Sequence, residues 1–306
     1  MAHIETVSGP IAPQDLGLTL SHEHILVDFA GAAVTGPHRW DRARVVARML
    51  PYLREAQGYG VRAVVECTPA YLGRDVRVLG RLSEASGLHL ITNTGLYREP
   101  HVPADAFPLT PEELAARWIA EWTDGIDGTA VRPGLIKIAV NPGALLPIQR
   151  KIVRAAALTH LATGLTIACH TNDAASAHEA LDIVEAAGMD PAHYIVVHAH
   201  NMPRASEQDA LHARGCWLSY DNVGGGGTLD TYLHLVTRAL EQGREGRVLI
   251  SHDAGWYHVG EPDGGAIRPF TAIFTDLLPA LRARGVDAGL EQTLLVHNPA
   301  RALTIG

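Results

Sequence analysis

Two histidines stand one residue apart in the stretch LSHEHILVD, near the end of an expected β-strand. Side chains two residues apart on a strand point to the same side, so His22 and His24 could bind one metal ion together. The chain has 17 histidines in 306 residues, and a second His-x-His motif occurs at His198 and His200. The motif alone is therefore weak evidence, and the rest of the chain must decide.

A single lysine adds to this pattern, because lysine is rare in the chain. Lys137 and Lys151 are the only two lysines among 25 basic residues. Lys137 lies within the apolar run GLIKIAV, where an ammonium group must lose its hydration or find a partner. The residues leave several roles open: a lysine that extends to a strand end, a Schiff-base amine, a general base, or a carboxylated amine that bridges metal ions.

The elements that must position these residues alternate regularly along the chain. Eight apolar runs bounded by Gly, Pro, Asn or Asp are the expected strands: 18–28, 61–68, 89–95, 134–140, 166–171, 194–200, 216–221 and 247–254. Segments of helical periodicity lie between them. This alternation predicts an α/β fold, a (β/α)₈ TIM barrel that forms a single domain over residues 1–306. A dinucleotide-binding sheet is disfavoured, because no G-x-G-x-x-G follows the first strand.

Catalytic residues of such a barrel come from the C-terminal ends of its strands and from the loops that follow them. The candidates at these ends are His22, His24, Lys137, His170, His198 and Asp253. Taken singly, His170 could be a hydrogen-bonded core histidine and Asp253 a loop cap. Taken together, imidazoles and a carboxylate without a cysteine cluster favour a catalytic site for Zn²⁺, Mn²⁺, Co²⁺ or Fe²⁺.

These segments resemble the phosphotriesterase family of the amidohydrolase superfamily, which includes phosphotriesterase-like lactonases. The resemblance covers nearly the whole chain: GLTLSHEHILVDF is followed in order by VVECTPAYLGRD, TNTGLY, GLIKIAV, ACHT, VVHAHN and ISHDAGW. It implies a binuclear metal site with a defined set of ligands. His22, His24 and Asp253 would hold one ion, and His170 and His198 the other. Lys137, carboxylated by CO₂, would bridge the two ions.

The resemblance also implies a mechanism, in which a hydroxide that bridges the two ions attacks the substrate. Asp253 would act as general base. Shortly after the histidine of the sixth strand, members of the family commonly carry an aspartate that accepts a proton. This chain has His200 there, which could accept the proton or line the pocket.

Further residues near the strand ends are predicted to contact the substrate: Tyr97, Arg98, Asp221, Trp256, Tyr257 and Arg268. Tyr97, Trp256 and Tyr257 could form an aromatic wall, or the last two could simply pack within their loop. The glycine run at residues 224–227 follows the seventh strand, where barrels often bind phosphate, although such a run is more often a flexible lid.

The expected reaction is hydrolysis of a lactone or carboxylic ester, with phosphotriesterase activity as a side reaction. The alternatives on the same metal centre are an organophosphate triesterase, a phosphorylated sugar-lactone hydrolase and an amidohydrolase. The alternative from another class is a metal-free barrel that binds a ligand without turning it over.

Charge and composition narrow the partners. A net charge of −8 lacks the basic surface that nucleic acid requires, and no apolar run is long enough to span a membrane. The N-terminus has no signal-peptide pattern, and Cys67, Cys169 and Cys216 are expected as buried thiols in a reducing compartment. We therefore expect a cytoplasmic enzyme for a small molecule, and the family resemblance suggests a homodimer.

Overall fold

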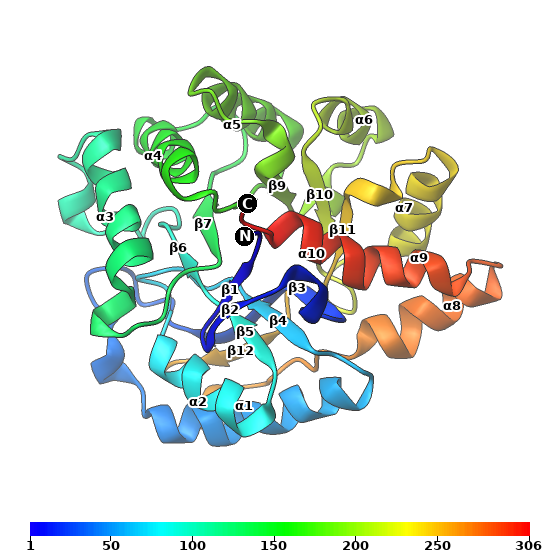
Figure 1. Ribbon diagram of the computed structural model, residues 1–306, viewed down its shortest axis with the longest axis horizontal. Coiled ribbons are helices and arrows are strands. Elements are labelled where there is room, and N and C mark those ends of the chain that lie inside the picture. The colour runs from blue at the N-terminus through cyan, green and yellow to red at the C-terminus, as the bar shows by residue number, and fades with distance from the viewer.

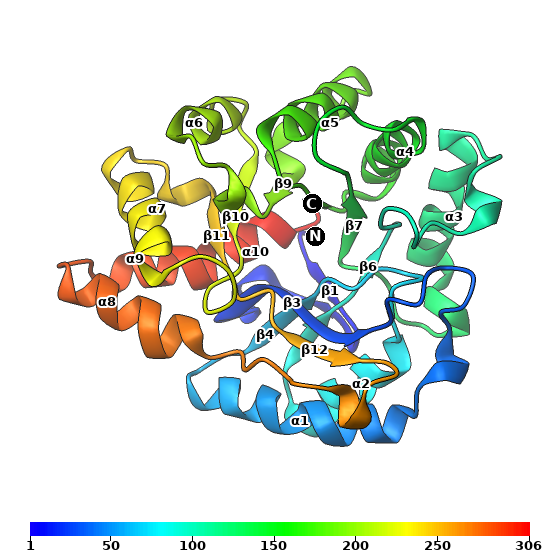
Figure 2. The same cartoon turned by 180° about the vertical axis from the view of Figure 1, so that it is seen from behind.

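The computed structural model describes residues 1–306 and contains a barrel of parallel strands surrounded by helices. Figures 1 and 2 show the strands in the centre and helices α1 to α8 around them. The barrel strands are β3 (Thr19–Val27), β4 (Ala63–Glu66), β5 (His89–Ile91), β6 (Asn93–Thr94), β7 (Leu135–Ala139), β8 (Ile167–His170), β9 (Tyr194–Val197), β10 (Trp217–Tyr220) and β11 (Val248–Ile250). The predicted (β/α)₈ barrel is therefore confirmed.

The order of the strands follows the chain. Hydrogen bonds join β12-β3-β4-β5 in one group and β6-β7-β8-β9-β10-β11 in another. Strands β5 and β6 are two parts of one extended segment, which links the groups. Between β11 and β3, the Ser21 hydroxyl donates to the Ile250 carbonyl at 3.3 Å, and the His22 amide donates to the Ser251 hydroxyl at 3.0 Å. These contacts close the barrel.

The helices follow the strands in sequence and cover their outer faces. They are α1 (Arg42–Gly58), α2 (Val76–Ser86), α3 (Pro111–Asp124), α4 (Pro147–Thr163), α5 (Ala174–Ala186), α6 (Ala205–Ala213), α7 (Leu229–Glu241), α8 (Leu278–Ala283), α9 (Ala288–Gln292) and α10 (Asn298–Leu303). Several begin at a side-chain cap. The Asp41 carboxylate accepts from two amides of the first turn of α1, and Thr110 forms a capping box with Glu113 at the start of α3.

One end of the barrel is closed by the two ends of the chain. Strands β1 (Ile4–Thr6) and β2 (Gly9–Ile11) form an antiparallel hairpin that was not expected from the sequence. The His3 amide donates to the Ile305 carbonyl at 3.0 Å, and Ile4 and Leu303 belong to the cluster of apolar residues inside the barrel. The opposite end, where the strands finish, is left for the candidate ligands.

Alternation along the strands decides which side chains enter the barrel. Leu135 belongs to the inner cluster of 14 apolar residues, whereas Ile136 and Ile138 belong to the outer cluster of 67 between strands and helices. Lys137 therefore shares the inner side with Leu135. Its ammonium group lies within the barrel and not between the barrel and the helices.

A bulge in β3 changes which side of the strand its later side chains face. Leu20 packs in the outer cluster. It lies two and four residues before His22 and His24, so regular alternation would point all three side chains to the same side of the strand. The pairing of β3 with β4 shifts between Leu20 and Glu23, so that β3 carries one extra residue there. Such a bulge turns the following side chains to the other face. His22 and His24 consequently point into the barrel, and Ile25 returns to the outer cluster.

A further strand lies where a loop was expected after the eighth barrel strand. Residues Gly255–His258 form β12, which pairs in parallel with the last part of β3. Strand β3 is nine residues long and extends past the four-residue β4, so its end would otherwise present unpaired backbone groups. The prediction of a loop at these four residues was wrong.

No helix in the structure is both long enough and apolar enough to cross a membrane. The three cysteines are buried and unpaired with one another, as the sequence predicts.

Candidate metal centre

Three of the predicted ligands meet where the middle of β3 lies beside the turn that follows β11. The Nε2 atoms of His22 and His24 lie 3.5 and 3.0 Å from Oδ1 of Asp253. The Nδ1 atoms of both rings are engaged on the far side, that of His24 with the Thr68 hydroxyl at 2.8 Å and that of His22 with Asp221 at 3.1 Å. Hydrogen bonds of this kind fix the ring orientation, so that both Nε2 atoms face the carboxylate.

The other two histidines form a second group beside the first. Nε2 of His198 lies 2.9 Å from Nδ1 of His170, and the rings of His22 and His198 are 5.3 Å apart. Strand β9 ends at Val197, one residue before His198, which adopts the left-handed conformation (φ 62°). This turn breaks the expected alternation and brings the ring toward His170.

Lys137 is 1% exposed, and the ion pairs around it join the histidines to Asp221 and Asp253 and do not include its ammonium group. Burial, together with the nearby charge of Lys137, lowers the pKa of His22 to about 4 and holds those of His24 and His170 well below their usual range. The imidazoles of these three residues are therefore neutral at pH 7, which is the form that binds metal.

Asp221 is placed differently from the sequence prediction of a substrate contact. It is fully buried, and its carboxylate accepts from Nδ1 of His22 at 3.1 Å and from Nδ1 of His198 at 2.7 Å. Both oxygens are thus engaged behind the rings, away from a substrate. We interpret Asp221 as the group that orients one histidine from each pair.

His200 also lies beside Asp221, although it forms no hydrogen bond to it. Its Nδ1 is 3.5 Å from Oδ1 of Asp221 and is buried without a hydrogen-bond partner. The ring lies 5.8 Å from that of His198 and 5.5 Å from that of Tyr232. Three groups, His198, His200 and Asp221, could in principle hold an ion, but Asp221 already serves two imidazoles.

Two of the predicted substrate contacts lie against the histidines. The Tyr97 hydroxyl is 3.1 Å from Nδ1 of His170, and the Trp256 ring is 4.1 Å from that of His24. Phe29, which is 52% exposed, stacks near Trp256 at 5.9 Å and extends this aromatic surface outward. Arg98 is close to Tyr97 but donates to the Asn141 side chain at 2.8 Å.

Two others point elsewhere. Tyr257 follows Trp256 on β12, so alternation sends it to the opposite side, where it lines a recess with Arg44 of α1. Arg268 donates to the Asn222 side chain at 2.9 Å and to the backbone carbonyls of the turn at Asp253. The structure therefore separates Tyr257 from the aromatic surface and gives Arg268 partners within the protein.

The sequence prediction missed Glu23, which lies between the two histidines of the opening motif. Its buried carboxylate accepts from the Ser251 hydroxyl at 2.8 Å, from the amide and Nδ1 of His252 at 3.0 and 2.8 Å, and from the Ala254 amide at 2.8 Å. A carboxylate on the outer face of an apolar strand needs such partners. That requirement was a usable signal.

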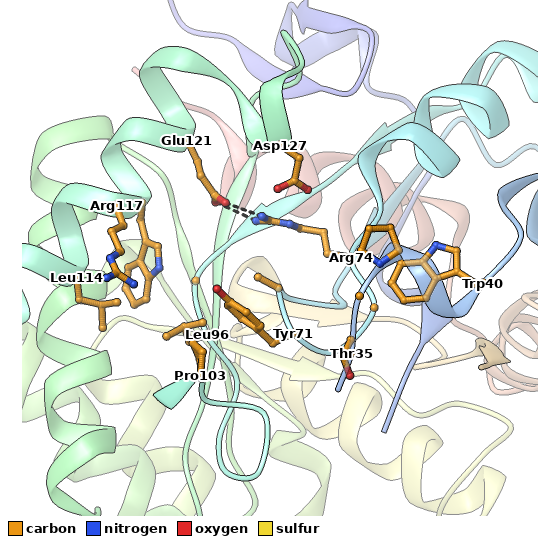
Figure 3. Close-up of a pocket in the computed structure, with 16 residues that line it drawn as sticks. Thr35, Trp40, Tyr71, Arg74, Leu96, Pro103, Leu114, Arg117, Glu121 and Asp127 are labelled. Carbon is orange, nitrogen blue, oxygen red and sulfur yellow. Dashed lines mark hydrogen bonds and ion pairs between the residues drawn. The ribbon is translucent and has the colours of Figure 1, made fainter. Parts of the chain in front are cut away.

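A separate cavity of about 280 Å³ lies beside α3 and the loops after β3, β4 and β6. Figure 3 shows Arg74 and Glu121 joined across it, with Tyr71 and Trp40 nearby. The guanidinium of Arg74 donates to both carboxylate oxygens of Glu121, at 2.9 and 2.5 Å. None of the predicted site residues lines this cavity.

Comparison with known proteins decides the family. The sequence profile of the phosphotriesterase family matches residues 2–303. The chain belongs to the phosphotriesterase family. It is 30% identical to a phosphotriesterase homology protein of Mycobacterium tuberculosis over 98% of this chain and 97% of the relative. It is 26% identical to an aryldialkylphosphatase of Saccharolobus solfataricus over 95% and 96% of the two chains.

A solved structure described as an organophosphate hydrolysis activity engineered from a weak promiscuous lactonase template is similar throughout. It superposes with a TM-score of 0.89 at 30% identity, over 98% of this chain and 99% of the other. The chain is thus a phosphotriesterase-family, metal-dependent hydrolase. Its donor set fits a metal, because buried imidazoles and a carboxylate converge at one end of the barrel, beside a buried lysine.

Proposed function

We propose that the protein hydrolyses a lactone or carboxylic ester at a centre of two divalent metal ions. His22, His24 and Asp253 would hold one ion, and His170 and His198 the other. Lys137, carboxylated on its side-chain nitrogen, would bridge them. The observation that carries the proposal is Lys137 itself, which is buried among these groups with no partner for its charge.

Carboxylation accounts for this burial. A buried ammonium group that forms no ion pair is costly, and the carboxylates of this centre, Asp221 and Asp253, are engaged with the imidazoles. The ammonium group loses one proton to become an amine, and addition of CO₂ to the amine releases a second, so the cation becomes a carbamate anion. Two oxygens at the end of a long side chain are then hard ligands suited to Zn²⁺, Mn²⁺, Co²⁺ or Fe²⁺.

The chain's own residues then have distinct tasks. When bound, a pair of divalent ions lowers the pKa of water and polarises the bond under attack. Asp253, whose side chain is 17% exposed, faces the mouth and would take the proton of the attacking water as general base. The proton would pass to the leaving oxygen as the acyl C–O bond breaks. Trp256 and Tyr97 would flank the substrate on two sides.

The related proteins support a carbonyl ester first and a phosphotriester second. The lactonase template of the similar structure favours lactones, whereas the aryldialkylphosphatase relative favours an organophosphate triester. The aromatic surface from Trp256 to Phe29 suits either an acyl chain or an apolar leaving group. The role of His200 is a related proposal: it would receive a proton by way of Asp221 or shape the pocket.

The test is metal content per chain, measured on protein purified with bicarbonate and incubated with Zn²⁺, Mn²⁺ or Co²⁺. We expect about two ions in the wild type and in Lys151→Ala, and a clear loss in Lys137→Ala. Lys151 is the matched control, because it is the only other lysine and donates to the Phe107 carbonyl far from the centre. No bound metal in any of the three would overturn the proposal and favour a ligand-binding barrel.

A panel of lactones, carboxylic esters and phosphotriesters then ranks the substrates by kcat/KM. Turnover of lactones or esters above phosphotriesters supports the first reading, and the reverse order supports the organophosphate triesterase. Borohydride trapping of a carbonyl compound on Lys137 would instead indicate Schiff-base chemistry.

A homodimer is also proposed from the family resemblance. Several large apolar side chains on the loops after β3, β4 and β6 are exposed, among them Phe29, Val34, Tyr71 and Phe107. A second copy would cover such side chains. Sedimentation equilibrium gives the mass directly, and a monomer at micromolar concentration would contradict the proposal.

A further inference from the structure

The turn that carries Asp253 has an unusual backbone. Asp253 adopts the left-handed conformation (φ 52°), which a residue other than glycine seldom takes. Such a conformation costs about 1–3 kcal/mol and persists only where the surroundings hold it. Its amide donates to the His22 carbonyl at 3.0 Å, and its carbonyl accepts from the Trp256 indole at 2.6 Å.

Two side chains of opposite charge form hydrogen bonds with the backbone of this turn from opposite sides. The Glu23 carboxylate accepts from the amides of His252 and Ala254, which flank Asp253. The Arg268 guanidinium donates through Nη2 to the carbonyls of His252 and Asp253. The carboxylate accepts from backbone N–H groups and the guanidinium donates to backbone C=O groups, so each charge faces the backbone dipoles that favour it. The turn is therefore held by charge-assisted hydrogen bonds.

The glycine run makes room for this guanidinium. A Cβ at Gly225 would lie 1.5 Å from Nη1 of Arg268 and 2.0 Å from Oδ1 of Asn222, and a Cβ at Gly226 would lie 2.7 Å from the amide nitrogen of Asn222. Gly225 does not have a positive φ, so the need for glycine there is one of space. The run encloses the pair formed by Arg268 and Asn222, which are 2.9 Å apart.

The segment that supplies Arg268 is itself fixed to the turn. The amides of Gly255 and Arg268 each donate to the carbonyl of the other at 3.0 Å. This bridge holds Arg268 opposite Gly255, which is two residues after Asp253 in the chain. One side chain thus connects three parts of the site: the loop of residues 222–227, the turn at Asp253 and the segment after β12.

We propose that Arg268 is a positioning residue: it holds the Asp253 turn in its left-handed conformation and ties the glycine loop to it, so that loop and carboxylate move as one unit. This rests on the proposed function of Asp253 at the metal centre. The glycine run then provides the space for the Arg268 side chain, and it is neither a phosphate-binding loop nor a freely moving lid.

The experiment compares Arg268→Met, Arg268→Lys and Gly225→Ala with wild type. Loss of an outer group that orients a ligand typically lowers activity or metal affinity about 10–100-fold, so we expect Arg268→Met to lose kcat on this scale with KM within about twofold. Gly225→Ala keeps the charge but displaces it, and we expect a loss of kcat in the same direction. Lysine cannot form the fork of hydrogen bonds, so Arg268→Lys should recover only part of the loss.

A second readout is independent of turnover. In metal-free protein, amide hydrogen exchange of residues 252–256 should be faster in Arg268→Met than in wild type, while exchange in the distant α4 stays unchanged. Arg48→Met is the matched control, because Arg48 also donates to backbone carbonyls after β12, at Asp263 and Gly265, but not to the Asp253 turn. It should leave both readouts at wild-type values.

Wild-type kcat and exchange rates in Arg268→Met would overturn the inference. So would a loss of activity that equals the loss of folded protein, because the arginine would then be a general structural tie. Failure of the proposed function is distinguishable: the wild type itself would bind no metal, whereas the exchange comparison would still report on the turn.

Discussion

Two buried polar regions lie side by side in this molecule, and their charges are arranged in opposite ways. In the cavity of Figure 3, Arg74 meets Glu121 through two hydrogen bonds, and Glu121 also accepts from the Thr94 hydroxyl at 2.5 Å. At the barrel mouth, Lys137 has no partner at all, and four imidazoles present a ring nitrogen to the same space. The cavity has its ion pair in place, although Nε of Arg74 has no partner. At the mouth, the carboxylates of Asp221 and Asp253 are shared among the imidazoles and form no ion pair with Lys137.

This difference distinguishes a structural ion pair from a functional site better than cavity size does. Burial alone does not separate them, since Arg74 and Lys137 are both nearly inaccessible. What separates them is whether the protein itself supplies the counter-charge. Buried polar groups normally find partners, so a cluster of them left open points to a bound species.

The largest effect should come from Asp253→Asn, which keeps the volume and removes the charge. We expect kcat to fall about 10²–10⁴-fold, because the base that takes the proton of water is lost. Asp127→Asn in the cavity is the control, since asparagine tolerates the left-handed conformation that Asp127 adopts. Steady-state kinetics at saturating metal give both values. A comparable loss of kcat in Asp127→Asn would contradict the assignment of a functional role to the mouth and a structural role to the cavity.

Glu121→Gln should remove the ion pair in the cavity and destabilise the fold, without changing the groups at the barrel mouth. It removes the ion-pair partner of the buried Arg74, which typically costs 3–5 kcal/mol, and we expect about 3 kcal/mol because Glu121 is 24% exposed. The free energy of unfolding in urea measures this, and kcat per folded molecule should not change. Lys137→Met in metal-free protein is the counterpart. It removes a charge without a partner, so unfolding should not become easier.

A third test uses pH and Glu66, which lies at the end of β4 between the two regions. Burial raises the pKa of Glu66 to about 7, and hydrogen bonds from Thr68 and the Ile25 amide, with the charge of Arg74, oppose this only in part. The folded protein therefore holds the proton more tightly than the unfolded chain. Its contribution to stability is full below about pH 4.5 and is lost as pH rises to about 7, a change on the order of 3 kcal/mol.

Glu66→Gln cannot ionise and should escape this loss. Relative to wild type, the variant should gain stability between about pH 4.5 and 7 and keep a constant advantage above pH 7. Urea unfolding at several pH values gives the difference curve. A difference that does not vary with pH would mean that Glu66 is ionised in the folded protein at all these values.

The smallest effect concerns the two neighbouring aromatics on β12. Trp256→Ala should raise KM for apolar esters about fivefold, the equivalent of about 1 kcal/mol of aromatic contact. Tyr257→Ala should leave KM unchanged, because that ring lies on the other side of the strand. If both raise KM equally, the loop rearranges around the substrate.

The sequence indicated which proposed ligands lie near one another, but not the residues that hold them in place. Alternation around Lys137 and the repeated strand ends predicted which residues converge, since these are local properties. Asp221 was assigned to the substrate because its partner His22 lies 199 residues away, and no local pattern reports such a contact. Tyr257 was misplaced because β12 forms only by pairing with the overhanging end of β3.

The single extra residue in β3 between Leu20 and Glu23 lets the strand absorb an insertion without turning over its later side chains. Leu20 and Glu23 pair with Val64 and Glu66, so Ser21 and His22 together stand opposite one residue of β4, Val65. Deletion of Ser21 would let β3 pair evenly with β4, with His22 opposite Val65, whose side chain lies inside the barrel. Leu20 and Glu23 would stay outside, and His22 and His24 would stay inside. Relatives of this chain that lack the bulge are therefore expected to keep both histidines in the barrel.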